Sequence, residues 1–167
     1  IVSPGEYRPQ IHLDRGCLPE DLTGRSVLDI GAWDGFFSFE AERRGAARVV
    51  AADSWAWQGR SPLSPKPGSS EPAFGSKRGF ELVHELRNSK VETTEAEVYD
   101  LDPDVIGTFD VVLFLGVLYH LPHPLLALEK VASVVAEGGW VIVETVIDQT
   151  FTRRPAAAFY PGSDLND

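Results

Sequence analysis

Residues 27–53, VLDIGAWDGFFSFEAERRGAARVVAAD, decide the fold, because an apolar run, a glycine turn, a helical pattern and a second apolar run follow one another. The segments 25–31 and 47–53 have the composition of buried strands. Between them, 36–45 repeats apolar residues at helical spacing and ends at Gly45, a residue typical of a helix carboxyl terminus. Two short strands joined by one helix form a βαβ unit, which predicts parallel pairing and a right-handed crossover.

The rest of the chain continues the alternation of strand and helix. Helical spacing covers 79–89, and 90–101 alternates like a strand. Residues 109–121 form a continuous apolar run of the kind that is buried on both faces of a sheet. A helical pattern over 125–139 ends at a glycine pair and leads into a strand pattern over 140–147. Between the third and fourth strands we expect a helix that is very short, about 103–106, or missing.

This order predicts an α/β fold, an open and mostly parallel Rossmann-like sheet with helices on both faces. We expect an irregular lead-in over 1–18 and a single domain over 19–167, which begins with one helical turn at 19–22. Residues 58–78 hold four prolines, three glycines and five serines, which predicts a long loop. Such loops are often functional lids, although a plain surface insert is an equal alternative.

Composition limits the function classes. The 167 residues carry a formal net charge of −10 with acids and bases interspersed, which disfavours a nucleic-acid partner but leaves it possible. Cys17 is the only cysteine, so an internal disulfide is excluded and a reducing cytoplasm is expected. No apolar run approaches the roughly 20 residues of a membrane span. The chain lacks methionine, so residue 1 is expected not to be the natural start, and the oligomeric state is left open.

The first turn points to a ligand at the carboxyl ends of the strands. In sheets of this kind ligands bind where strand order reverses, so the ends at Gly31, Asp53 and Gly116 should line one crevice. Glycines let the backbone approach a ligand, and the helix that follows offers unpaired N–H groups. Asp53 is placed to accept hydrogen bonds from a ribose diol. Trp33 stands where a dinucleotide fingerprint needs its second glycine, so nicotinamide and flavin dinucleotides are disfavoured.

These residues resemble the class I S-adenosylmethionine-dependent methyltransferases. VLDIGAWDG is similar to their first motif, in which an acid precedes the glycine turn by two residues. Asp53 matches the acid that holds the ribose, EVYDL resembles the segment beside the adenine, and FDVVLFLGVLYHLPHP resembles the fourth-strand motif. The resemblance runs from about 23 to 144. It implies S-adenosylmethionine as cofactor and a sheet of seven strands, so with five counted here the carboxyl-terminal strands are expected to be missing or truncated.

The resemblance also implies the site. The expected cofactor contacts are Asp29, Gly31, Ala32, Trp33, Gly35, Asp53, Ser54, Trp55, Glu97, Val98, Tyr99, Leu115, Gly116 and Tyr119. His120 is the candidate base if the acceptor is a hydroxyl; an amine or an activated carbon needs none. Structural alternatives stay open, since Asp53 could merely cap the next segment and Tyr119 and His120 could merely pack. No metal is expected, because His120, His123 and the nearby acids lack a ligand spacing.

Within this superfamily, WDGFFSFEAERRGA and LGVLYHLPHPLLALE resemble most closely the branch of the tRNA wobble-uridine (5-oxyacetyl-forming) methyltransferase. Those enzymes hold a carboxylated cofactor with a lysine, and an ungapped alignment puts Ile11 at that place, so ordinary S-adenosylmethionine is expected. Three functions remain. The leading hypothesis is methylation of a hydroxyl on a small-molecule acceptor, the second is an RNA modification enzyme of the wobble-uridine type, and the third is a non-catalytic domain that binds the cofactor or a partner.

Overall fold

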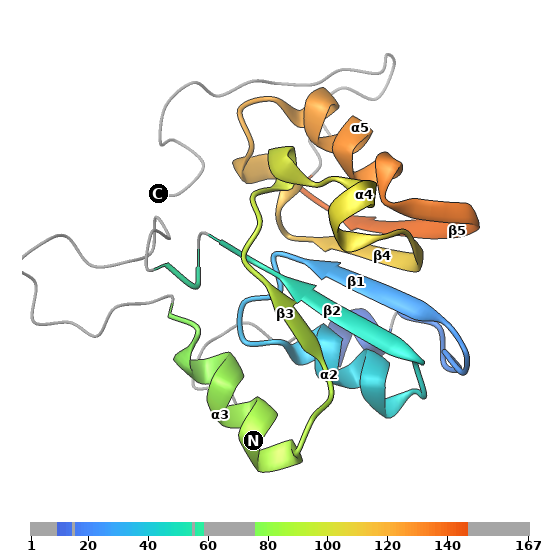
Figure 1. Ribbon diagram of the computed structural model, residues 1–167, viewed down its shortest axis with the longest axis vertical. Coiled ribbons are helices and arrows are strands. Elements are labelled where there is room, and N and C mark those ends of the chain that lie inside the picture. The colour runs from blue at the N-terminus through green and yellow to red at the C-terminus, as the bar shows by residue number, and fades with distance from the viewer. Residues whose placement is uncertain (1–9, 15, 55, 59–75, 147–167) are drawn as a thin grey trace, which may run out of the picture.

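The structure, a computed structural model, describes residues 10–14, 16–54, 56–58 and 76–146. Five strands form one sheet in the order β3-β2-β1-β4-β5, and every strand pair is parallel (Figure 1). The strands are β1 (Ser26–Ile30), β2 (Arg48–Ala52), β3 (Glu92–Thr94), β4 (Phe109–Leu115) and β5 (Val135–Glu144). The helices are α1 (Gln10–Asp14), α2 (Phe36–Arg43), α3 (Arg78–Arg87), α4 (Pro103–Ile106) and α5 (Pro124–Ser133), with 3₁₀ turns η1 (Val98–Asp100) and η2 (Leu118–His120). The predicted α/β class and its parallel, Rossmann-like sheet are confirmed.

Apolar side chains cover both faces of the sheet. On one face α2 and α3 contribute Phe39 and Phe80 to a core that includes Val27 and Val111. On the other face α5 contributes Val131 to a second core, which includes alternate residues of the same strands. Side chains alternate across a strand, so the continuous apolar run of β4 supplies both cores. Figure 1 shows α4 and α5 apart from α2 and α3.

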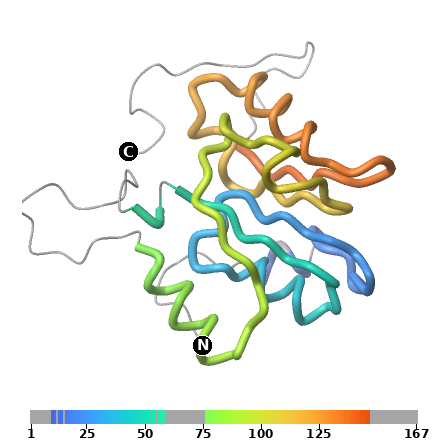
Figure 2. The backbone as a smooth tube through the Cα atoms, in the orientation of Figure 1, coloured from blue at the N-terminus to red at the C-terminus, as the bar shows by residue number. Residues whose placement is uncertain are grey.

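The order in which strands are added to the sheet reverses at the central strand, β1. From β1 the chain moves outward to β2 and β3, and then returns across β1 to β4 and β5. Figure 2 shows this as a blue-to-green half of the molecule and a yellow-to-orange half. The reversal lies between β1 and β4, whose carboxyl ends are therefore the place where this fold class binds ligands.

The helix after β1 ends as predicted. Gly45, with φ +86°, donates its N–H to the Glu42 carbonyl, and Ala46 donates to the Ala41 carbonyl. This pair of bonds is the Schellman arrangement, which a residue with positive φ makes possible.

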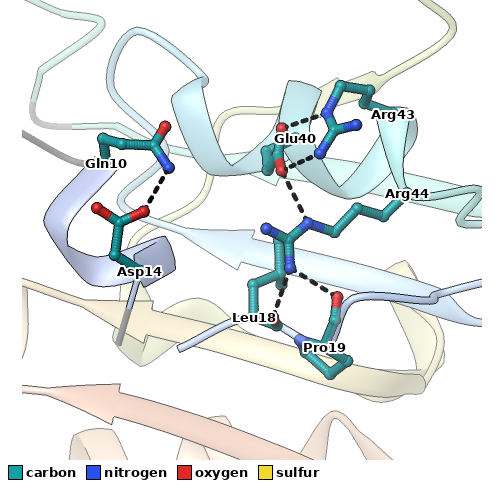
Figure 3. Close-up of polar contacts among 7 residues, drawn as sticks. All are labelled: Gln10, Asp14, Leu18, Pro19, Glu40, Arg43 and Arg44. Carbon is teal, nitrogen blue, oxygen red and sulfur yellow. Dashed lines mark hydrogen bonds and ion pairs between the residues drawn. The ribbon is translucent and has the colours of Figure 1, made fainter. Parts of the chain in front are cut away.

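The amino-terminal segment differs from both predictions made for it. Helix α1 lies within the expected irregular lead-in 1–18, and 19–22 forms no helical turn. Figure 3 shows the reason: the Arg44 guanidinium reaches from the end of α2, donates to the carbonyls of Leu18 and Pro19, and bonds Glu40 at 2.8 Å. Those carbonyls point at a side chain instead of at a helical turn, while Leu18 and Leu22 are buried in the first core.

The strand predicted over 90–101 was too long. Only Glu92–Thr94 pairs with β2, and the chain then forms η1. Val98 and Leu101 are both buried in the second core. Residues three apart face the same side in a helical turn but opposite sides in a strand, so burying both favours the turn.

The boundary between the last helix and strand was also wrong. α5 ends at Ser133 and β5 begins at Val135, so the glycine pair lies inside the strand. Phe109 pairs with Val135 whereas Val111 pairs with Trp140, which places a bulge between the two pairs. A Cβ on Gly139 would lie 2.9 Å from the Asp110 carbonyl oxygen, so the bulge passes too close to β4 for a side chain. The short helix 103–106 is present as α4.

The segments 59–75 and 147–167 of the single domain predicted over 19–167 lie outside the described residues. Most of the predicted loop 58–78 and the carboxyl-terminal segment are therefore not described.

Candidate functional site

Parallel pairing brings the predicted strand ends together at one edge of the sheet. Ile30 of β1 pairs with Ala52 of β2 on one side and with Phe114 of β4 on the other. Gly31 and Asp53, which directly follow these paired residues, therefore lie side by side. Leu115 pairs with Glu144, so the order of strand ends continues from β4 to β5.

The glycine turn after β1 is held by main-chain bonds and by packing. Gly31 donates its N–H to the Ala52 carbonyl at 2.8 Å, and Gly35 donates to Ala32 at 2.7 Å. A Cβ on Gly31 would lie 2.4 Å from Val117 Cγ2, and one on Gly35 would meet the rings of Phe39 and Phe80. The space a side chain would need is thus filled by protein atoms. Besides any approach to a ligand, both glycines are required by the packing of the turn, and their φ angles of +76° and +77° favour glycine as well.

Asp53 joins the second strand to this turn. Its Oδ2 accepts the N–H of Trp33 at 3.0 Å, and its Oδ1 accepts the N–H of Ala56 at 3.0 Å. The carboxylate therefore does cap the segment after β2, as the structural alternative held, and the backbone N–H groups of Ser54 and Trp57 also act on it. Asp53 is only 6% exposed. Burial raises the pKa of its carboxyl, and backbone N–H groups partly offset that rise.

Trp33 lies between the two strand ends with a positive φ of +46° and 40% exposure. Its carbonyl accepts the indole N–H of Trp57 at 2.8 Å, which ties the turn to the segment after Asp53. A bulky residue tolerates this conformation only when surrounding contacts fix it, and here hydrogen bonds hold both its N–H and its carbonyl.

Asp29 lies beneath the turn and is buried together with Ala32. The Ser38 hydroxyl of α2 donates a 2.6 Å hydrogen bond to Asp29 Oδ2. Burial raises the pKa of Asp29 to about 6; the Ser38 bond opposes the rise and the charge of Asp53 adds to it. Asp29 therefore binds the first strand to α2 and holds a proton far more readily than an exposed aspartate.

The residues expected beside an adenine divide into two groups. Ser54 is buried directly after Asp53, and Trp55 lies outside the described residues. Glu97, Val98 and Tyr99 are not on a strand: Glu97 precedes η1, Val98 is buried, and the Tyr99 hydroxyl accepts the N–H of His123 at 3.0 Å. Tyr99 thus links η1 to the loop before α5.

The end of β4 gathers the remaining predicted residues. Gly116, with φ +72°, follows Leu115 and donates its N–H to the Glu144 carbonyl at 3.1 Å. Tyr119 and His120 lie in η2 with ring centroids 4.2 Å apart, and both are exposed. Although both side chains reach solvent, partial burial raises the pKa of Tyr119 and lowers the pKa of His120, so the imidazole is held toward its neutral form. A neutral imidazole is the form that can accept a proton.

Glu144 was missed by the sequence reasoning. A Cβ on Gly116 would lie 3.6 Å from Glu144 Oε2 and 3.7 Å from the Tyr119 hydroxyl, so both polar atoms face the exit of β4. The available signal was an acid at the end of a strand, as at Asp53. That signal could not be used, because the sequence does not show the bulge that sets the register of β5 and so the face on which Glu144 lies.

Other ligand classes find little support in the described part of the chain. Across those residues no group of three or more His, Cys, Asp or Glu side chains is placed to hold a metal ion. None of the described helices combines the length and the apolar composition required to span a bilayer.

The family described as "Methyltransferase domain" matches residues 6–164. The tRNA U34 carboxymethyltransferase of Campylobacter hominis is 29% identical over 126 residues, which cover 75% of this chain and 38% of that protein. The protein of the same name from Haemophilus influenzae is 27% identical over 146 residues, covering 85% of this chain and 39% of that protein. The chain thus spans about two fifths of the length of these relatives.

Solved structures share the fold. A crystal structure of a Pyrococcus horikoshii protein superposes with a TM-score of 0.60 at 24% identity, covering 84% of this chain and 58% of that one. A complex of DhpI with SAM and HEP gives a TM-score of 0.58 at 23% identity, covering 84% and 55%.

Proposed function

The chain belongs to the methyltransferase domain family, and from that membership we propose that it binds S-adenosylmethionine and transfers its methyl group to a hydroxyl of a small molecule. One observation carries the cofactor assignment. The turn after β1 and the acid after β2 meet through the bond from Trp33 N–H to Asp53 Oδ2, beside the point between β1 and β4 where the strand order reverses. We assign the ribose hydroxyls to the carboxylate of Asp53, which already accepts the backbone N–H groups of Trp33 and Ala56.

In this assignment the residues of the site bind and orient. Asp53 holds the ribose, the main chain at Gly31 and Ala32 lies beside the methionine part, and Ser54 and the segment Glu97–Tyr99 border the adenine. Leu115 and Gly116 offer main-chain groups at the next strand end. The complex of DhpI with SAM, which shares this fold, is consistent with the choice of cofactor.

The reaction needs little from the protein besides position. The bond between the methyl carbon and sulfur breaks, and its electron pair returns to sulfur to leave S-adenosylhomocysteine. A lone pair of the acceptor oxygen forms the new C–O bond, and the hydroxyl proton passes to a base. Holding the reactants in line can supply roughly 7–11 kcal/mol, whereas a general base adds about 10²–10⁴ in rate.

His120 is the proposed base, with Tyr119 beside it. The lowered pKa of His120 keeps the imidazole neutral near pH 7 and therefore able to accept the proton.

A second candidate function is modification of the wobble uridine of tRNA, which the two carboxymethyltransferases at 29% and 27% identity favour. The net charge of −10 favours a small acceptor instead, because affinity for a phosphate backbone comes from lysine and arginine.

Isothermal titration of the chain with S-adenosylmethionine and S-adenosylhomocysteine tests the first step. Stoichiometric binding of both is expected. A folded chain that binds neither would refute the proposal, whereas binding without turnover on any acceptor would favour a non-catalytic role.

A further inference from the structure

The end of β5 adds a polar group to the site that the cofactor contacts do not use. Glu144 Oε2 and the Tyr119 hydroxyl lie 3.6 and 3.7 Å from the same point, the position of a Cβ on Gly116. Glu144 comes from β5 and Tyr119 from η2, so two elements converge on the exit of β4. Leaving aside Gly116 and its chain neighbours, these are the two described atoms within 4 Å of that point.

Strand order places this point on the acceptor side of the proposed cofactor. If the ribose lies at Asp53 on β2 and the methionine part lies at Gly31 on β1, the next strands in line are β4 and then β5. Gly31 already contacts the β4 loop, because Val117 fills its Cβ position. The next strand end beyond the methionine part is therefore that of β4, which Glu144 and Tyr119 face.

The charge of Glu144 acts at this end of β4. The pKa of Tyr119 is raised first by burial and then by the negative charge of Glu144. The described residues that follow β4 and β5, 116–123 and 145–146, contain no lysine or arginine. This carboxylate would repel an anionic acceptor, and none of these described residues supplies a compensating cation.

We propose, on the basis of the proposed function, that Glu144 and Tyr119 face the methyl group to be transferred and select an acceptor that carries hydrogen-bond donors and no negative charge. The carboxylate accepts a hydrogen bond from a hydroxyl or ammonium of the acceptor, which fixes its orientation beside His120. A phosphorylated acceptor is rejected at this position.

The test needs no knowledge of the acceptor. Sinefungin carries an amine at the position of the transferred methyl group, while S-adenosylhomocysteine has nothing there. Titration calorimetry of both ligands at low salt gives the ratio of their dissociation constants. Because a carboxylate bonds a cationic amine strongly, the wild type should bind sinefungin about tenfold more tightly, and Glu144→Gln should remove most of that preference while the S-adenosylhomocysteine constant stays within about twofold.

Glu137→Gln is the matched control, since it removes the same charge near the other end of β5, where Glu137 is exposed. It should leave the ratio unchanged. Tyr119→Phe is a second probe from a different element and should lower the ratio in the same direction. If Glu144→Gln fails to fold, the Tyr119→Phe result decides alone.

An unchanged ratio in Glu144→Gln, or an equal loss of both ligands, would overturn the assignment of Glu144 while the cofactor site stands. Absence of binding by either ligand in the folded wild type would instead overturn the proposed function, and this inference with it.

Discussion

The main-chain N–H of Trp33 donates a 3.0 Å hydrogen bond to Asp53 Oδ2, and so joins the turn after β1 to the end of β2. One carboxylate thereby shapes the glycine turn and caps the segment that follows β2. The site is built around this bond.

Replacing Asp53 should weaken cofactor binding. Asp53→Ala removes a charged acceptor that the ribose would use, which costs about 1–3 kcal/mol, or roughly 5- to 150-fold in the dissociation constant of S-adenosylhomocysteine. Calorimetry measures this, with Asp104→Ala in α4, which is exposed, as control. A dissociation constant that matches the wild type would remove Asp53 from the ribose site.

A comparison of two glycines with nearly the same φ angle distinguishes the cost of a steric clash from the cost of an unfavourable backbone conformation. Gly31 and Gly24 have φ of +76° and +75°, but a Cβ on Gly24 meets nothing within 4 Å, whereas one on Gly31 lies 2.4 Å from Val117 Cγ2. Gly24→Ala should therefore cost only the conformational term, about 1–2 kcal/mol of unfolding free energy. Gly31→Ala should cost about 1–3 kcal/mol more.

Urea unfolding measures both variants, and Val117→Ala tests the cause. In the double variant with Gly31→Ala the excess cost should shrink, because the clashing methyl group is gone. Equal costs for Gly31→Ala and Gly24→Ala would show that the turn yields to the new side chain.

The two arginines at the end of α2 should differ sharply in how much they contribute to the free energy of unfolding. The Arg44 side chain is 10% exposed and bonds Glu40 and two carbonyls of the amino-terminal segment, whereas Arg43 is 60% exposed and bonds only Glu40 (Figure 3). Arg44→Ala leaves partly buried carbonyls unpaired and should cost about 1–3 kcal/mol in thermal or urea unfolding. Arg43→Ala should cost below about 1 kcal/mol, because exposed ion pairs contribute little. Similar losses would contradict the clamping role of Arg44.

Asp29 should make stability depend on pH. Burial raises its folded-state pKa to about 6, from the 3.8 expected in an unfolded chain, so the folded state holds this proton through that range while the unfolded state releases it. The Asp29 contribution to stability is therefore full below about pH 4 and is lost as pH rises toward 6. In Asp29→Asn this loss is absent. Relative to the wild type, the free energy of unfolding of the variant should therefore rise on the order of 2–3 kcal/mol between pH 4 and pH 7.

Urea unfolding of both proteins across that range gives the difference, in which the titration of groups that do not interact with Asp29 cancels. The Asn side chain keeps an oxygen to accept the Ser38 hydroxyl. A difference that does not vary with pH would mean that Asp29 titrates normally.

The sequence alone determined the βαβ core and its turn. The apolar runs of β1 and β2, the helical spacing of α2 and the ending at Gly45 are local patterns. The helix satisfies its own backbone hydrogen bonds, and the two strands pair with each other within the same unit. The parallel order of the strands followed from their connections. That is why Gly31, Asp53 and Gly116 could be expected at one edge before their positions were known.

Only the tertiary structure decided the rest, because it depends on contacts between distant segments. Leu18 and Pro19 are held by an arginine more than twenty residues away, and the glycine pair before Trp140 forms a bulge because it passes the backbone of β4. Glu144 reaches the site only through that bulge, since each residue added to a strand changes the face its side chains occupy. Sequence period fixes which residues form an element, but register and burial between elements fix what those residues touch.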